Sequence, residues 1–436
     1  MYLGRRRAAF AFAIPALVLV PLLAWQARDG MDVFFARLLL VPSAAGTLVL
    51  GTIVLAFWRL ASMTWAFADA RGAPRSLSVR RGGPAWYQRP RRTNVVFAAL
   101  VASVIGMHSV VAWTGLAFLD GLSGVYVAEG PRSTPEPGST PNNLGSLPTP
   151  YSTPEPNGRI NVLLIGADSG LGYDHSLTDT LILVTVDPVA KTVDMMSLPR
   201  DIARFSLYSG GTYAGKINSL ASYAAARPGQ FPEGGFGTLT REVGYLLGAP
   251  VHYYAYVDLA GFKAVVDAVG GVDIVNQKQI SDPGYGFPDG AHGFFMTPGP
   301  HHLDGRRALA YARSRNGPGD NDFTRARRQQ ELLLSLKVAF LKPTNLANLP
   351  TILNALAHTI QTDYPADGLP DLLLLAKQIP EASVTHLVLG PPYARRPTAS
   401  TGTYELLIDE SKFAALSIRI FGSDSRYASP SPSSSP

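Results

Sequence analysis

Three long runs of apolar residues, all in the first 120 positions, constrain this chain more than any other feature of its sequence. Each run lacks Asp, Glu, Lys and Arg, and each is long enough to cross a hydrocarbon core of about 30 Å as a helix. The runs are Ala8 to Trp25, Leu38 to Trp58 and Val95 to Leu119. We therefore predict that residues 1–119 form a membrane anchor of three transmembrane helices.

The first run has an alternative interpretation as a cleaved signal peptide, because Arg5, Arg6 and Arg7 precede it. A signal peptide ends at a cleavage site made of small residues. The run is followed by no convincing site of this kind, and two further apolar runs come after it. The sequence favours a retained span.

Arginines in the short connections predict the orientation of the anchor. The loop from Arg59 to Thr93 carries eight arginines and the single acid Asp69, whereas the two arginines between the first two runs are balanced by two aspartates. Positively charged loops stay in the cytoplasm. We therefore expect a multi-pass cell-membrane protein whose remaining chain is extracytoplasmic. Much of the net charge of +6 then comes from arginines that fix the orientation in the membrane. These arginines therefore do not indicate nucleic acid as a partner.

Two segments have compositions that cannot form a packed core. Residues 120–158 are rich in Pro, Ser, Thr, Gly and Asn, and the run Thr-Pro-Glu-Pro occurs there twice. Such segments form extended spacers. Residues 428–436 are a shorter stretch of low complexity, which we expect to be a disordered tail.

Between these segments, residues 159–427 have the composition of a globular domain. Short apolar runs alternate with helical periodicities, which predicts an α/β fold with a mixed central β-sheet flanked by helices. The strands are expected at Ile160–Ile165, Thr180–Val186, Thr192–Ser197, His252–Val257, Val272–Val275 and Val384–Leu389. The helices are expected at Thr238–Leu247, Leu259–Val269, Phe323–Phe340, Leu346–Ile360 and Gly368–Ile379.

Two carboxylates stand at predicted strand ends. Asp168 follows the first strand and Asp179 precedes the second. Hard oxygen ligands on neighbouring strands suit Mg²⁺, which completes its shell with water and substrate phosphate. The alternative is that each aspartate only organises a turn.

Arginines provide a second set of candidates. Arg200 follows a strand end, and Arg313 and Arg315 would point to one side if their segment were extended. Asp322, Arg325 and Gln329 have the spacing that places them on one face of a helix. Guanidinium groups are natural partners of phosphate oxygens. A solvated basic helix is the alternative.

Other chemistries are weakly supported. The chain has no cysteine, which excludes thiolate catalysis and disulfides. Asp168-Ser169-Gly170 lacks the surroundings of a serine nucleophile. His301-His302 has no further spaced ligands and is more typical of a surface loop than of a metal site.

Taken together, the motifs of the outer domain resemble those of the LytR-CpsA-Psr family of cell-wall glycopolymer transferases. Each motif is weak alone, but their shared order and spacing are specific. They are Asn161 to Asp168, Thr178 to Thr180, Ser197 to Asp201, Lys216 to Asn218, Val269 to Asp273, Leu303 to Gly305, Tyr311 to Arg315, and Asp322 to Arg325 with Arg328 to Gln330.

The resemblance implies an enzyme that moves a glycopolymer from a polyprenyl-pyrophosphate carrier onto peptidoglycan, forming a phosphodiester. It implies Mg²⁺, or Mn²⁺ in its place, on Asp168 and Asp179. Four arginines would bind the pyrophosphate oxygens, Asp322 and Gln329 would orient them, and Lys216 would lie at the edge of the site. The four arginines are Arg200, Arg313, Arg315 and Arg325.

Two positions depart from the family pattern, since Gly170 and Leu177 stand where members often carry arginine. This leaves open a non-catalytic protein that binds polyprenyl phosphate. A transcriptional regulator is a further alternative, because members of the family have carried that label, but the predicted topology argues against it. The apolar residues Phe262, Val265, Val266 and Val269 are either core or the lining of a prenyl groove.

Overall fold

The computed structural model describes two compact units, which divide between Leu122 and Ser123. The described residues are 41–72, 90–126, 158–168, 177–287, 289–315, 319–347, 360–397 and 403–428, with a few isolated positions between them. Most of the first apolar run, of the predicted spacer and of the tail lies outside these ranges. The first predicted span, the predicted spacer and the predicted tail are therefore compared with the structure only where residues are described.

Two long helices form the described part of the first unit: α3 (Pro42–Gly72) and α5 (Pro90–Val125). Gly46–Ala68 and Asn94–Trp113 within them are long and apolar enough to cross a membrane. Large apolar side chains such as Phe57 and Trp113 are exposed, as expected for surfaces that face lipid. The predicted end at Trp58 is too early, because the helix continues past the lone Arg59 into another apolar stretch.

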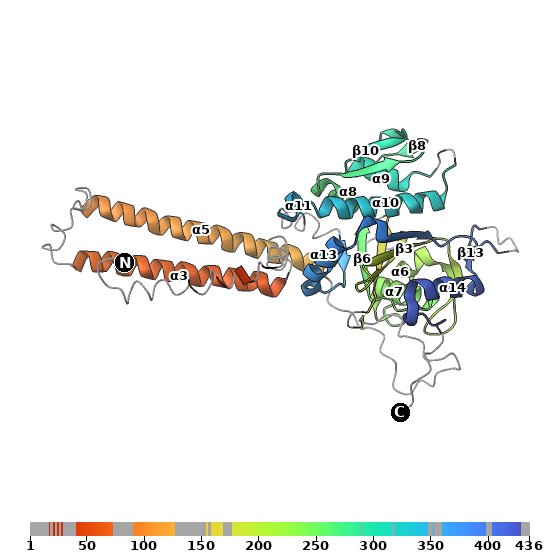
Figure 1. Cartoon of the computed structure of the whole chain (residues 1–436), viewed down its shortest axis with the longest axis horizontal. Coiled ribbons are helices and arrows are strands. Elements are labelled where there is room, and N and C mark those ends of the chain that lie inside the picture. The colour runs from red at the N-terminus through yellow and green to blue at the C-terminus, as the bar shows by residue number, and fades with distance from the viewer. Residues whose placement is uncertain are drawn as a thin grey trace, which may run out of the picture. The chain divides into compact units, whose positions relative to one another are not determined.

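The second unit is built around a six-stranded mixed sheet in the order β11-β6-β1-β2-β3-β12. Figure 1 labels β6 and β3 of this sheet. β1 pairs antiparallel with β2 and parallel with β6, while β3 pairs antiparallel with β2 and parallel with β12. This confirms the predicted mixed sheet. The strands are β1 (Ile160–Ala167), β2 (Thr178–Asp187), β3 (Thr192–Leu198), β6 (Tyr253–Asp258), β11 (Ile360–Thr362) and β12 (Val384–Val388).

Alternation along the strands separates the two faces of the sheet. Leu163 and Ile165 of β1 belong to a large core with α6 (Leu220–Ala225), α7 (Gly234–Leu247) and α14 (Glu410–Phe421). The opposite face meets α10 (Asp322–Phe340), whose buried Gln330 donates to the Ser197 hydroxyl. α13 (Leu369–Gln378) packs at the far end of that face. Helices thus cover both faces, as predicted.

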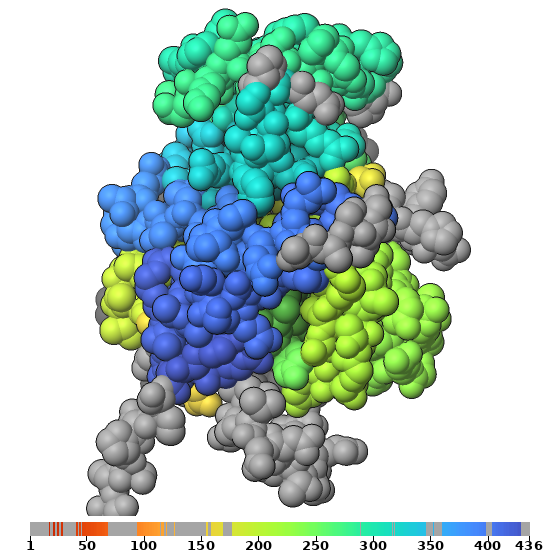
Figure 2. All heavy atoms as spheres, turned by 90° about the vertical axis from the view of Figure 1, so that its right-hand side faces the viewer, coloured from red at the N-terminus to blue at the C-terminus, as the bar shows by residue number. Residues whose placement is uncertain are grey.

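A second core lies beside α10. It joins α8 (Leu259–Ala268) and α9 (Gly305–Arg313) to two ribbons, β7–β10 and β8–β9. These residues, in teal, form the top of the view in Figure 2, above the deep blue C-terminal residues. The ribbon strands are β7 (Val272–Asn276), β8 (Ile280–Gly286), β9 (His292–Met296) and β10 (Gly299–Leu303). Val266 and Val269 are buried in this core, which is the first of their two predicted environments.

Smaller elements complete the unit. The β4–β5 hairpin (Ala203–Ser206 and Thr212–Lys216) and the pair β13–β14 (Ala394–Arg395 and Leu407–Ile408) extend from the arginine-bearing end of β3. Caps agree with the sequence: the Asp258 side chain accepts from the Gly261 amide at the start of α8, and Gly248 adopts a left-handed conformation after α7.

Three local predictions need correction. The Arg313 segment is not extended, because Gly305–Arg313 forms α9 and the chain leaves the helix only at Ser314. The strand Val272–Val275 exists but pairs with β10 outside the central sheet. The helix predicted over Leu346–Ile360 is wrong at its end, since Ile360 begins β11; α11 (Pro343–Ala347) precedes a stretch that is largely outside the described residues.

Candidate anion-binding site

A pocket opens at one end of the central sheet, between strands and the first turns of α10. Its polar lining comes from β2, from the segment after β3, and from α10. Apolar lining is added by the ends of β3 and β12 and by a segment before β14. The lining residues used below are Asp179, Arg200, Asp201, Asp322, Arg325, Gln329 and Tyr404.

Asp179 owes its position to a β-bulge. Gly166 of β1 pairs with Thr180 and Ala167 pairs with Thr178, so Asp179 is an extra residue in β2. A bulge changes the direction of side chains and is common beside functional sites. Asp179 Oδ2 accepts a hydrogen bond of 2.8 Å from Arg200 Nη1, while its buried Oδ1 has no such partner among the described residues.

Arg200 follows β3 and is held between two carboxylates. Its Nε lies 3.8 Å from Asp201 Oδ2, and Asp201 Oδ1 accepts from Lys216 Nζ at 2.5 Å. Lys216 thus contacts the site through Asp201. This agrees with the predicted place of Lys216 at the edge of the site. Its ammonium group, however, pairs with the carboxylate of Asp201.

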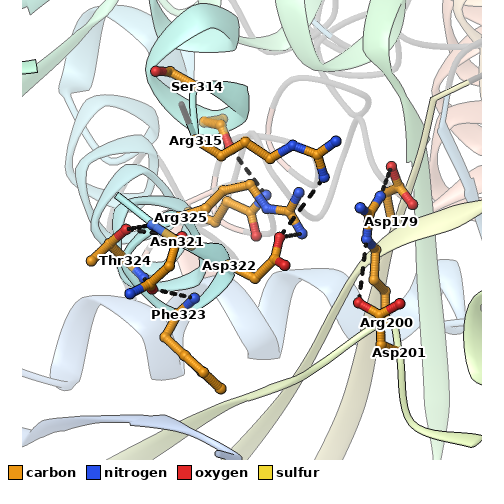
Figure 3. Close-up of polar contacts among 12 residues, drawn as sticks. Asp179, Arg200, Asp201, Ser314, Arg315, Asn321, Asp322, Phe323, Thr324 and Arg325 are labelled. Carbon is orange, nitrogen blue, oxygen red and sulfur yellow. Dashed lines mark hydrogen bonds and ion pairs between the residues drawn. The ribbon is translucent and has the colours of Figure 1, made fainter. Parts of the chain in front are cut away.

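The start of α10 contributes the opposite wall (Figure 3). Asn321 and Thr324 form a capping box that fixes the first turn. Asp322 Oδ1 lies 3.1 Å from Arg325 Nη2 and 4.0 Å from Arg315 Nη1. The predicted shared face of Asp322, Arg325 and Gln329 is confirmed, because all three line the pocket.

The electrostatics show that three arginines share one environment. Burial lowers the pKa of Arg325, and the charges of Arg200 and Arg315 lower it further. The negative charge of Asp322 raises it. Burial opposes the charge of Arg200 too, but the hydrogen bond and charge of Asp179, with Asp322 and Asp201 nearby, raise its pKa overall. The Nε atoms of both Arg200 and Arg325 are buried without a hydrogen-bond acceptor in the described part of the chain. The site therefore holds donors that an anion can use.

A buried aspartate that the sequence analysis missed supports the Arg315 segment. Asp282 of β8 is fully buried, and its Oδ2 accepts from Ser314 Oγ at 2.8 Å and from the Arg315 amide at 3.3 Å. Gln329 Nε2 donates to the Ala312 carbonyl at 3.2 Å, so it positions backbone, not a guanidinium. No periodic signal marks Asp282, because its partner is 32 residues away.

Four of the predicted residues do not line the pocket. Arg315 and Lys216 reach it only through their ion pairs with Asp322 and Asp201, and Arg313 and Asp168 lie further away. Arg313 is exposed at the end of α9, and its charge acts on Tyr285 of β8. Asp168 is exposed directly after β1, one residue beyond the Ala167–Thr178 pair. Gly170 is outside the described residues, and Leu177 is 38% exposed.

The donor set fits one divalent cation in part. The orphaned Oδ1 of Asp179 is a hard oxygen of the kind that Mg²⁺ prefers, and Asp168 stands at the adjacent strand end. Among the described residues, no group of three or more His, Cys, Asp or Glu could hold a metal alone. A cation here would thus take most of its ligands from water and from a bound anion.

These features define a class: an α/β domain with an arginine-rich pocket for phosphate-like anions, following helices of transmembrane length. The comparison with known proteins identifies the family, since the LytR_cpsA_psr family model matches residues 139–415, more than half of the chain. The chain belongs to this family, and the resemblance inferred from its motifs is confirmed.

Individual relatives agree with this assignment. The chain is 29% identical over 213 residues to the polyisoprenyl-teichoic acid–peptidoglycan teichoic acid transferase TagU of Bacillus mycoides, covering 49% of this chain and 63% of that protein. It is 32% identical over 215 residues to the regulatory protein MsrR of Staphylococcus aureus, covering 49% and 59%. The matches thus span less than two thirds of these relatives.

A solved structure shares the fold. The crystal structure of Bacillus subtilis TagV matches 61% of this chain and 97% of its own, with a TM-score of 0.50 and 24% identity.

Proposed function

We propose that the outer domain transfers a glycopolymer from a polyprenyl-pyrophosphate carrier to peptidoglycan. The observation that carries the proposal is that Arg200 and Arg325 line one pocket, with Arg315 beside them at Asp322. The Nε–H groups of Arg200 and Arg325 have no acceptor among the described residues and can donate to an anion. The name of the TagU relative, a teichoic acid transferase that acts on peptidoglycan, supports the same class of reaction.

In this reaction, the acceptor hydroxyl oxygen forms a bond to the phosphorus that carries the glycopolymer, and the hydroxyl proton is lost. The bridging P–O bond on the lipid side breaks, so polyprenyl phosphate leaves and the product is a phosphodiester. Charge develops on the leaving phosphate. Arg200 and Arg325 are held beside that charge before the reaction begins, which is the arrangement that lowers such barriers.

Each remaining residue has a role in this scheme. Asp322 orients Arg315 and Arg325 through its ion pairs. Gln329 holds the end of α9, and Lys216 orients Asp201 beside Arg200.

Asp179, with Asp168, would hold Mg²⁺ or Mn²⁺. When bound, such a cation neutralises pyrophosphate charge. Arg313, outside the pocket, would meet a more distant part of the substrate.

The test is turnover by the full-length protein in detergent with Mg²⁺ and a polyprenyl-pyrophosphate saccharide, measured as release of polyprenyl phosphate. We expect Arg200→Ala to reduce turnover about 10²–10³-fold, because a preorganised donor at the developing charge is lost. Arg313→Ala tests the exposed arginine separately. Arg327→Ala is the matched control, since Arg327 is exposed on the same helix as Arg325.

The outcomes separate the alternatives. Unchanged turnover in both Arg200→Ala and Arg313→Ala contradicts the assignment of the arginines. Lipid that copurifies with a wild-type protein unable to turn over substrate supports a binding protein instead. That reading is favoured by the uncharged Leu177 at a position where arginine is common in the family.

We also propose that the domain is extracytoplasmic and anchored by the N-terminal helices. The arginine-rich connection between Gly46–Ala68 and Asn94–Trp113 supports a cytoplasmic loop. A reporter fused after Gly158 should be active only outside the cytoplasm. Activity only in the cytoplasm would reverse the topology and favour the regulatory alternative.

A further inference from the structure

An exposed aromatic side chain stands at the mouth of the pocket, where the mechanism gives it no role. Tyr404 lines the same pocket as Arg200 and Arg325, yet 40% of its surface is exposed. The guanidinium carbon of Arg396 lies 4.7 Å from the centre of the Tyr404 ring. We call this pair the Tyr404–Arg396 shelf.

Backbone contacts hold the shelf against the segment that bears Arg200. The Leu406 amide donates to the Asp201 carbonyl at 2.9 Å, and the Ala203 amide donates to the Leu406 carbonyl at 3.0 Å. Glu405 adds an ion pair of 3.0 Å to Arg204. The chain next to Tyr404 is thus held against the segment that follows Arg200.

The chemistry of the shelf matches a sugar ring. The face of an aromatic ring carries partial negative charge, so it attracts the polarised C–H groups on one face of a pyranose. A guanidinium beside it offers donors to hydroxyl or anionic substituents. Ligand sites typically combine aromatic surface with a few polar groups in this way. An exposed cation–π pair alone is a weak interaction and does not require the ring to lie in the pocket lining.

We propose that the Tyr404–Arg396 shelf binds the first pyranose ring of the donor, the sugar attached directly to the pyrophosphate. This inference rests on the proposed function, because it takes the arginine pocket as the pyrophosphate site. It adds a saccharide-binding subsite at a defined side of that pocket. The shelf then selects for donors that carry a sugar over the bare carrier lipid.

The test compares two probes on the full-length protein in detergent: polyprenyl pyrophosphate bearing one hexosamine, and the same lipid without sugar. We expect Tyr404→Ala to weaken binding of the sugar-bearing probe about 3–10-fold and to leave the bare lipid unchanged. Tyr404→Phe keeps the ring and should stay within about twofold of wild type. Phe295→Ala removes an aromatic ring that is 60% exposed elsewhere and is the matched control.

The outcomes are distinguishable from failure of the proposed function. Wild-type protein that binds neither probe overturns the proposed function and the subsite with it. Wild-type protein that binds both probes, with Tyr404→Ala either unchanged or weakened equally for both, overturns only the subsite. A thermal melt of each variant shows whether the domain remains folded.

Discussion

Two clusters in this domain remove arginines from water beside carboxylates, and they differ in how completely the arginines are paired. In α7, Arg241 donates through Nε and Nη2 to Glu242 and through Nη1 to Glu233. At the pocket, Arg200 and Arg325 each keep a buried Nε without an acceptor among the described residues. We call the α7 cluster closed, because every guanidinium nitrogen of Arg241 donates to a carboxylate. We call the pocket cluster open, because two of its arginine Nε atoms lack an acceptor among the described residues.

The difference indicates what each cluster is for. Glu242 is fully buried, and burial raises its pKa, although the Tyr208 amide and Arg241 act to lower it. The closed cluster uses its charges to hold α7 to the Tyr208 segment. The open cluster has incomplete pairing, which lowers stability and retains binding capacity for an anion.

The largest expected effect is on the closed cluster. Arg241→Ala leaves the buried Glu233 and Glu242 facing each other without a cation, so we expect it to lower the free energy of unfolding by about 3–5 kcal/mol. Chemical denaturation of the full-length protein in detergent checks this. Turnover per folded molecule should stay near wild type. A fall in turnover without loss of stability would erase the distinction between the clusters.

The opposite pattern is expected at the open cluster. Because burial lowers the pKa of Arg325, its charge opposes folding, and Arg325→Met should leave the melting temperature equal or higher. Turnover should fall about 10²–10³-fold. Arg327→Met, on the exposed side of α10, should change neither quantity. A strongly destabilised Arg325→Met would mean that this arginine is structural.

Removal of the proposed cation should give the next largest effect. Asp179→Asn keeps the shape of the side chain but weakens both the metal site and the bond to Arg200, so we expect about a 10–100-fold loss of turnover. Chelation of divalent cations should reduce wild type strongly and the variant little. Equal activity of wild type with and without chelator would remove the cation from the proposal.

The smallest expected effect concerns the orientation of Arg200. Asp201→Asn and Lys216→Met each break the 2.5 Å ion pair, and each should lower turnover about 3–10-fold. Because both remove one interaction, the double variant should resemble either single variant. Fully additive losses would show that Lys216 contacts substrate independently of Asp201.

Local signals made much of the fold predictable. The β2–β3 hairpin was predictable because a turn at Asp187 separates two apolar runs, and the face of α10 because Asp322, Arg325 and Gln329 repeat at helical spacing. Long-range contacts were not predictable. The pairing of Asp201 with Lys216 depends on the β4–β5 hairpin. The helix α9 was missed because it is short and its first turn is charged.

The bulge at Asp179 has a consequence for how this site could be lost. Side chains alternate along a strand with a period of two, so one extra residue reverses the alternation on one side of it. Deletion of Asp179 alone would let Thr178 join Thr180 in a regular ladder with β1. One codon therefore separates the site from an ordinary sheet, and a descendant lacking it would keep the fold while losing the carboxylate that holds Arg200.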